Sequence, residues 1–256
     1  MITLLTYDHS LDGFFTAVFE VYEYKIEKAE IRKEGLPKPA LFYGLHRVIT
    51  DSKKAERVFK KLNALLGESG IQQIIYSLLT EDEYCERPIL EVIRYAIANP
   101  EKKIMSNMTN QSVLKLERYT KQVGREKHRM EAFVRFRLIT DDIYFAEIEP
   151  DFNVMPIIAK HFAQRYQDQK WLIFDQKRRY GLYYNLQTIE TVQMDFNNKS
   201  ENLATLGNNE DLYQKLWRTY FDKTNIKARK NSRLHVQHVP KRYWRYLTEK
   251  QVFKDF

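Results

Sequence analysis

The sequence predicts an α+β fold with a helix-rich N-terminal part, an antiparallel-sheet core with flanking helices, and a basic C-terminal segment. Apolar residues recur at helical spacing through much of the first 128 residues, whereas short segments of alternating polarity dominate residues 130–194. Residues 223–256 hold ten basic and two acidic residues, and this excess of eight equals the net charge of +8 of the whole chain. We therefore expect an N-terminal α/β region, residues 1–82, followed by a core domain, residues 83–256.

The composition indicates a globular protein of 256 residues, 43% of them hydrophobic, which is enough to bury a sizeable core. A single cysteine, Cys85, excludes an internal disulfide and a thiolate-built zinc site, so we expect no metal and no cofactor. The chain has no long uncharged apolar run and no signal-peptide core, which predicts a cytoplasmic protein without a membrane partner. An isoelectric point near 9.3 favours nucleic acid as the partner.

The N-terminal region is expected to begin with a strand, residues 2–7, followed by a turn and a helix at about residues 14–22. Ser10 or Asp12 is the expected cap of that helix. The pattern then predicts a loop over residues 23–39 and a strand over residues 40–50. Three helices follow, over residues 52–66, 71–79 and 89–98. Gly67 is placed just past the end of the first of these helices.

A basic ridge is predicted on a helix over residues 112–128. Arg118, Lys121, Arg125 and His128 recur every three or four residues, which places them on one helix face, and Arg129 continues the run. Residues 118–137 contain seven basic and two acidic residues, a local excess of five. The ridge is either an ordinary solvated face or a surface for phosphates.

A β-hairpin is expected next, with strands at residues 130–139 and 143–149. If Ile139 pairs with Ile143, Arg135 lies opposite Glu147. The carboxylates of Glu147, Glu149 and Asp151 have two interpretations. They are catalytic acids or metal ligands, or they form cross-strand ion pairs and a helix cap.

The remaining core is expected to contain one helix, a basic turn and three strands. The helix begins at residues 153–156 and carries His161, and the basic turn is residues 176–179. The strands are residues 171–175, 180–185 and 188–194. A surface loop, residues 195–209, and an amphipathic helix, residues 210–221, lead to the basic tail.

The tail mixes residue types that neutralise phosphates with aromatic residues. Tyr243, Trp244 and Tyr246 either stack on unpaired bases or close the core. His235 and His238 alone do not make a metal site, so they contact phosphate or bases, or pack. The predicted nucleic-acid-binding residues of the chain are Arg118, Lys121, Arg125, His128, Arg129, Arg135, Arg137, Arg178, Arg179, Lys227, Arg229, Lys230, Arg233, His235, His238, Lys241, Arg242, Trp244 and Arg245.

Four segments are recognisable as those of a known family: GREKHRMEAFVRFR (124–137), FAEIEPDFNVMPIIAKHFAQRYQDQKWLIFD (145–175), LWRTYF (216–221) and LHVQHVPKRYWRYL (234–247). With the opening TYDHSLDGFFTAVFEVY, they resemble a bacterial family labelled "probable DNA metabolism protein". The resemblance implies a setting in DNA repair or modification, beside a radical-SAM protein or fused to a uracil-DNA glycosylase. It implies no catalytic residue. One cysteine is too few for a radical-SAM cluster, so this chain would be the companion of such an enzyme.

Three functions follow as hypotheses. The first is a DNA-binding accessory factor that delivers DNA to a partner enzyme. The second is an enzyme acting on a damaged base or nucleotide, whose candidate groups are Glu147, Glu149, Asp151, Asp175 and His161. The third is an RNA-binding protein.

Overall fold

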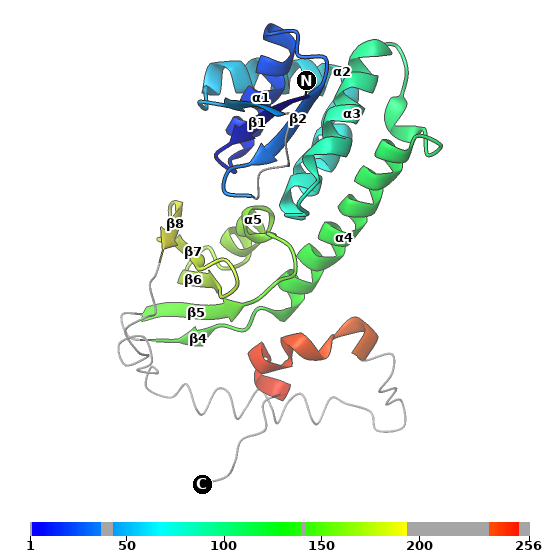
Figure 1. Ribbon diagram of the computed structural model, residues 1–256. Coiled ribbons are helices and arrows are strands. Elements are labelled where there is room, and N and C mark those ends of the chain that lie inside the picture. Colours follow the sequence, from blue (N-terminus) through cyan, green and yellow to red (C-terminus); the bar gives the residue numbers. More distant parts are fainter. Residues whose placement is uncertain (1, 37–42, 140–141, 194–235, 251–256) are drawn as a thin grey trace. The chain divides into compact units, whose positions relative to one another are not determined.

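A computed structural model describes residues 2–36, 43–139, 142–193 and 236–250 (Figure 1). The fold is mixed α and β with two sheets, which confirms the predicted α+β class. The chain forms two compact units, Met1–Gly124 and Arg125–Phe256, which we call unit 1 and unit 2. This division falls inside a helix, and the expected domain boundary after residue 82 stays a prediction.

Unit 1 is built on a parallel three-stranded sheet of order β2-β1-β3. The strands are β1 (Ile2–Tyr7), β2 (Ala29–Lys33) and β3 (Tyr43–Arg47). The prediction of a loop over residues 23–39 was wrong, because it contains β2. Only Ile31 of β2 is fully buried, where it pairs with Leu5 of β1, so the tertiary pairing outweighs the charged composition of the segment.

The helices of unit 1 begin and end largely where local signals predicted. Helix α1 (Leu11–Glu23) is capped by Ser10, whose Oγ accepts a 2.9 Å hydrogen bond from the amide of Gly13. Helix α2 (Ser52–Leu79) is interrupted at Gly67, as the two predicted helices required. Helix α3 (Glu86–Ala98) and the short 3₁₀ helix η1 (Ile104–Ser106) follow. Their apolar faces pack against α1 and the sheet in one core.

Substitution of Gly67 tests whether the interruption of α2 requires glycine. Its φ of 68° and ψ of 177° lie in a region that only glycine adopts readily, so Gly67→Ala should destabilise the protein by about 1–3 kcal/mol. Gly124 on helix α4 (Gln111–Phe133) is the matched control, since a Cβ there also meets nothing within 4 Å. Gly124→Ala should stabilise by about 0.5–1 kcal/mol. Urea denaturation of both variants measures the difference, and equal shifts in both would contradict it.

Helix α4 extends further than expected. Residues 130–133 belong to the helix, so the prediction of a strand from Met130 was wrong, and strand β4 is only Arg137–Leu138. The physical reason is the spacing of the buried side chains: Val123, Glu126 and Met130 continue one helical face. The apolar residues from Met130 onward are compatible with a strand and with a helix. The helix continues because Met130 extends the buried face of α4.

Unit 2 contains a five-stranded sheet of order β4-β5-β6-β7-β8. Its later elements are β5 (Ile143–Ile148), α5 (Met155–Arg165), β6 (Lys170–Asp175), β7 (Tyr180–Tyr184) and β8 (Ile189–Gln193). Among the described residues, three strand pairings of this sheet are antiparallel, as expected, and β5 pairs with β6 in parallel. Helix α5 is the connection that brings the chain back in the same direction.

The described C-terminal segment, residues 236–250, has a helical turn at residues 236–238 and two short 3₁₀ helices, η4 (Lys241–Tyr246) and η5 (Thr248–Lys250). The predicted loop at 195–209 and helix at 210–221 lie outside the described residues, as do Lys227, Arg229, Lys230, Arg233 and His235. Within the described part of the chain, no helix has the length and apolar character needed to cross a membrane.

Candidate nucleic-acid interface

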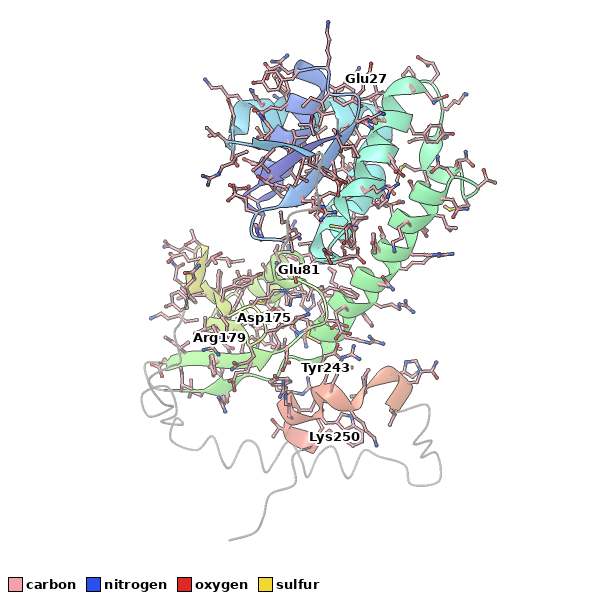
Figure 2. The ribbon with its side chains drawn as sticks, viewed as in Figure 1. Glu27, Glu81, Asp175, Arg179, Tyr243 and Lys250 are labelled. Atoms are coloured by element: carbon pink, nitrogen blue, oxygen red, sulfur yellow. The ribbon has the colours of Figure 1, made fainter. Side chains whose placement is uncertain are left out.

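The carboxyl ends of β5 and β6 form the foundation of the candidate site. Because these two strands are parallel neighbours, the loops that follow them lie at the same edge of the sheet. Glu149, Pro150 and Asp151 come after β5, and the turn 176–179 comes after Asp175, the last residue of β6. Figure 2 labels Asp175, which directly precedes this turn, and Arg179, its last residue.

Asp175 organises the turn from a fully buried position. Its Oδ1 accepts hydrogen bonds from the backbone amides of Lys177 (2.9 Å) and Arg178 (3.1 Å). Its Oδ2 accepts a 2.8 Å bond from the guanidinium of Arg178. That guanidinium, only 8% exposed, also donates to the carbonyls of Pro150 and Asp151 at 3.2 Å each. Arg178 therefore ties the two loops together, and its position suits a structural role better than contact with a ligand.

Helix η4 packs onto this edge through Tyr243. The Tyr243 ring is 2% exposed and lies 5.7 Å from that of Phe133, and its hydroxyl donates to the carboxylate of Glu126 on α4. Burial and the neighbouring Glu126 raise the pKa of Tyr243, so the hydroxyl stays protonated as a donor. Stacking of Tyr243 on bases, one of the two alternatives for this residue, is therefore excluded, because the ring closes the core.

Glu126 connects three segments from a position that is 1% exposed. Besides the Tyr243 hydroxyl, it accepts a 2.8 Å hydrogen bond from the backbone amide of Asp151. Arg129 lies 3.4 Å and Arg242 3.7 Å from its carboxylate. Sequence reasoning missed Glu126, although its spacing from Val123 and Met130 places it on the buried face of α4 and could have revealed it.

A polar pocket of about 520 Å³ opens where these loops meet η4. It is lined by Glu149, Pro150, Asp151, Lys177, Lys241, Arg242 and Arg245. Four of these side chains are basic and two are acidic. Arg242 pairs with Asp151 at 2.5 Å and Arg245 pairs with Glu149, yet the two arginine side chains remain 43% and 62% exposed. The polar pocket thus gathers cations that are exposed enough to meet a ligand.

The predicted pairing of Arg135 with Glu147 was wrong, although its register was right. The amide of Ile139 donates to the carbonyl of Ile143 as expected, but strand β4 begins only at Arg137, so Arg135 lies outside it. Glu147 therefore pairs with Arg137, at 3.0 Å. Arg135 turns away and pairs with Glu249 of η5, at 2.9 Å.

The other predicted residues are distributed over the surface of their own elements. Arg118, Lys121, Arg125 and His128 are exposed on α4, and Lys121 pairs with Glu117 at 3.0 Å. Arg179 and His238 are also exposed. Trp244 is half-buried: its indole nitrogen donates to the carbonyl of Val239 at 3.0 Å, and the ammonium of Lys250 lies 5.5 Å from its ring.

Of the candidate groups for catalysis, Glu149 and Asp151 line the polar pocket, whereas Glu147, Asp175 and His161 are not in its lining. Glu147, Glu149, Asp151 and Asp175 each pair with an arginine. His161 lines a different pocket and lies 3.9 Å from Glu131. Among the described residues, no group of three or more His, Cys, Asp or Glu side chains is arranged to hold a metal ion.

One family matches most of this chain. It is described as "Domain of unknown function (DUF4130)", and the match covers residues 83–249. The chain belongs to this family. The DUF4130 match contains both loops, helix α4 and helix η4, so all residues of the polar pocket lie within it.

Other comparisons add little. No curated protein matches the chain. A solved DHH domain, described as belonging to a member of a family of ribosomal proteins, is 11% identical, with 71% of this chain and 73% of that chain covered and a TM-score of 0.33. The pGpG-specific phosphodiesterase PggH from Vibrio cholerae is 12% identical, with coverages of 88% and 99% and a TM-score of 0.31. Both likenesses are too weak to support an argument about this chain.

Proposed function

We propose that this DUF4130 protein is a DNA-binding accessory factor that acts in the bacterial cytoplasm in DNA repair or base modification. Its partner would be a radical-SAM protein or a uracil-DNA glycosylase, as the resemblance of its sequence segments implies. The observation that carries the binding function is the convergence of basic side chains on the polar pocket.

The chemistry of the polar pocket suits phosphate groups. Lys177 comes from the turn after β6, whereas Lys241, Arg242 and Arg245 come from η4, more than sixty residues later. A folded chain that brings four cations to one place at the surface creates a local positive potential. Since Arg242 and Arg245 already hold carboxylates in solvent-exposed ion pairs, a phosphate oxygen can replace Asp151 or Glu149 at small cost.

The ridge on α4 supports the same proposal. Arg118, Lys121, Arg125 and His128 are exposed along one face of a single helix. Such a face adds contacts to the DNA backbone that carry no sequence information. We therefore expect binding that depends strongly on salt and weakly on sequence.

The alternative of a carboxylate-based hydrolase is less favoured. An active site needs its acid and base groups in one pocket, but Glu149 and Asp151 line the polar pocket, His161 lines another, and Asp175 is buried in its pair with Arg178. The third hypothesis, RNA binding, is separated by comparing RNA and DNA of equal sequence.

Replacing Lys177 and Lys241 with alanine should weaken binding to duplex DNA. If each lysine neutralises one phosphate, the slope of log K against log salt should become shallower by about 0.9 per lysine. Fluorescence anisotropy of a labelled duplex over a salt series measures this. The control is Lys53→Ala with Lys60→Ala, two exposed lysines of unit 1, which removes the same charge and should change the slope little.

Equal slopes for the two double variants would refute the phosphate-binding role of the polar pocket. Absence of binding by the wild type at low salt would refute the proposed function itself. The same assay, repeated with a purified radical-SAM or glycosylase partner, tests whether the two proteins share one DNA complex.

A further inference from the structure

Unit 2 has a second, larger pocket, which the polar pocket and the α4 ridge do not explain. It has a volume of about 870 Å³ and is lined by the end of α4, by β4 and β5, and by α5. We call it the aromatic groove, because Phe136, Tyr144, Phe162 and Tyr166 line it. Its lining also includes Thr248 of η5.

Three of the aromatic side chains that line the groove, Phe136, Phe162 and Tyr166, form one cluster. The Phe136 ring lies 5.3 Å from that of Tyr166 and 5.8 Å from that of Phe162, both edge to face. Behind them, Trp171 is fully buried, whereas Phe136, Tyr144 and Tyr166 keep part of their surface exposed. A half-exposed aromatic cluster in a pocket offers apolar area for a flat ligand.

The rim of the groove is basic. His128, Arg135, His161 and Arg165 line it, and the guanidinium of Arg165 lies 5.7 Å from the Tyr166 ring. Of the described residues that line the groove, Glu131 alone is acidic, and its carboxylate is paired with Lys127 at 2.5 Å. Arg135 is already paired with Glu249 at 2.9 Å, and His161 lies 3.9 Å from Glu131. Arg165 is exposed, so it is the rim cation best placed to meet an anionic ligand that carries flat rings.

We propose that the aromatic groove binds unpaired bases of single-stranded DNA. The bases stack on the partly exposed aromatic rings, and Arg165 at the rim contacts an adjoining phosphate, which is the combination by which proteins hold single strands. A base inside a duplex is already stacked and paired, so the groove favours single-stranded over duplex DNA. This inference rests on the proposed DNA binding and names the form of DNA that the protein prefers.

The test compares a labelled oligo-dT strand with a duplex of equal length by anisotropy. Replacing Phe136 and Tyr144 together with leucine keeps apolar bulk but removes the two ring faces. We expect the Kd for the single strand to rise about tenfold or more, and the Kd for the duplex to stay nearly unchanged. Tyr24→Leu, at a 56% exposed tyrosine of unit 1, is the matched control. Circular dichroism and thermal melting check the fold of each variant.

Cross-linking of the wild-type protein keeps the proposal testable if the double variant fails to fold. Oligo-dT with 5-iodouracil at one position should, on irradiation, attach to a peptide that contains Phe136, Tyr144 or Tyr166. Attachment only elsewhere, unchanged single-strand affinity in a folded double variant, or binding of RNA but not DNA would overturn the proposal. If the duplex still binds in a salt-dependent way, these results leave the proposed function standing.

Discussion

Glu126→Ala is expected to destabilise unit 2 by about 3 kcal/mol and to release helix η4. Glu126 is 1% exposed, and its removal leaves the buried Tyr243 hydroxyl and the amide of Asp151 without their acceptor. A hydrogen bond to a charged group contributes about 1.5–3 kcal/mol, and an unsatisfied buried donor costs more than a bond that was never made. Because these bonds join α4, the loop after β5 and η4, their loss should affect all three.

Urea denaturation measures the loss of stability, and limited trypsin digestion measures the release of η4. Trypsin should cut at Lys241, Arg242 and Arg245 much faster in the variant. Glu126→Gln should lose less stability, since the amide oxygen still accepts from Tyr243. Glu117→Ala, at a glutamate paired with Lys121 on the same helix, should cost less than about 1 kcal/mol.

A Glu126→Ala variant with unchanged stability and unchanged digestion would contradict this account of η4. The release of η4 also has a functional consequence. It removes Lys241, Arg242 and Arg245 from the polar pocket, so the variant should bind DNA more weakly even at temperatures where unit 2 remains folded.

Asp175→Ala is expected to cost about 3–5 kcal/mol, the usual range for breaking a buried ion pair from one side. The side chains of Asp175 and Arg178 are 0% and 8% exposed. Without the carboxylate, the Arg178 guanidinium loses its buried counter-charge, and the turn amides of Lys177 and Arg178 lose their acceptor. The carbonyls of Pro150 and Asp151 would then be held less firmly.

A double-mutant cycle separates the pair from its surroundings. The variants are Asp175→Ala, Arg178→Ala and the two together, with the free energy of unfolding measured by denaturant titration. We expect the double variant to be clearly more stable than the sum of the single losses predicts. Arg47→Ala is the control: Arg47 pairs with Glu34 but is 77% exposed, so its loss should be below about 1 kcal/mol. Strict additivity would show that the pair contributes no coupling.

Local chemistry made part of this fold predictable. Ser10 caps α1 because its hydroxyl accepts from an amide three residues away, and Gly67 interrupts α2 because its own φ requires glycine. Both effects act within a few residues, so a sequence pattern reveals them. The charged strand β2 was missed because its pairing with β1 joins residues about 26 positions apart.

The site was predictable in residue type but not in arrangement. The sequence indicated basic residues near both loops, and Lys241, Arg242 and Arg245 do meet at the polar pocket. It did not indicate that Tyr243, in the middle of the same run, would turn inward to a glutamate 117 residues earlier. Nor did it indicate the aromatic groove, whose rings come from the residue before β4, from β5, and from α5 and its C-cap.

The sequence by itself determined the α+β class, most of the helices and strands, and where the positive charge is concentrated. These follow from periodicity, capping and composition, all of which are local or additive. Only the tertiary structure decided which cations face carboxylates and how exposed they remain, as with Arg135 and Glu249, 114 residues apart. The physical reason is that the energy of a charge depends on its distance to other charges and on its burial, and both quantities exist only once distant segments have packed together.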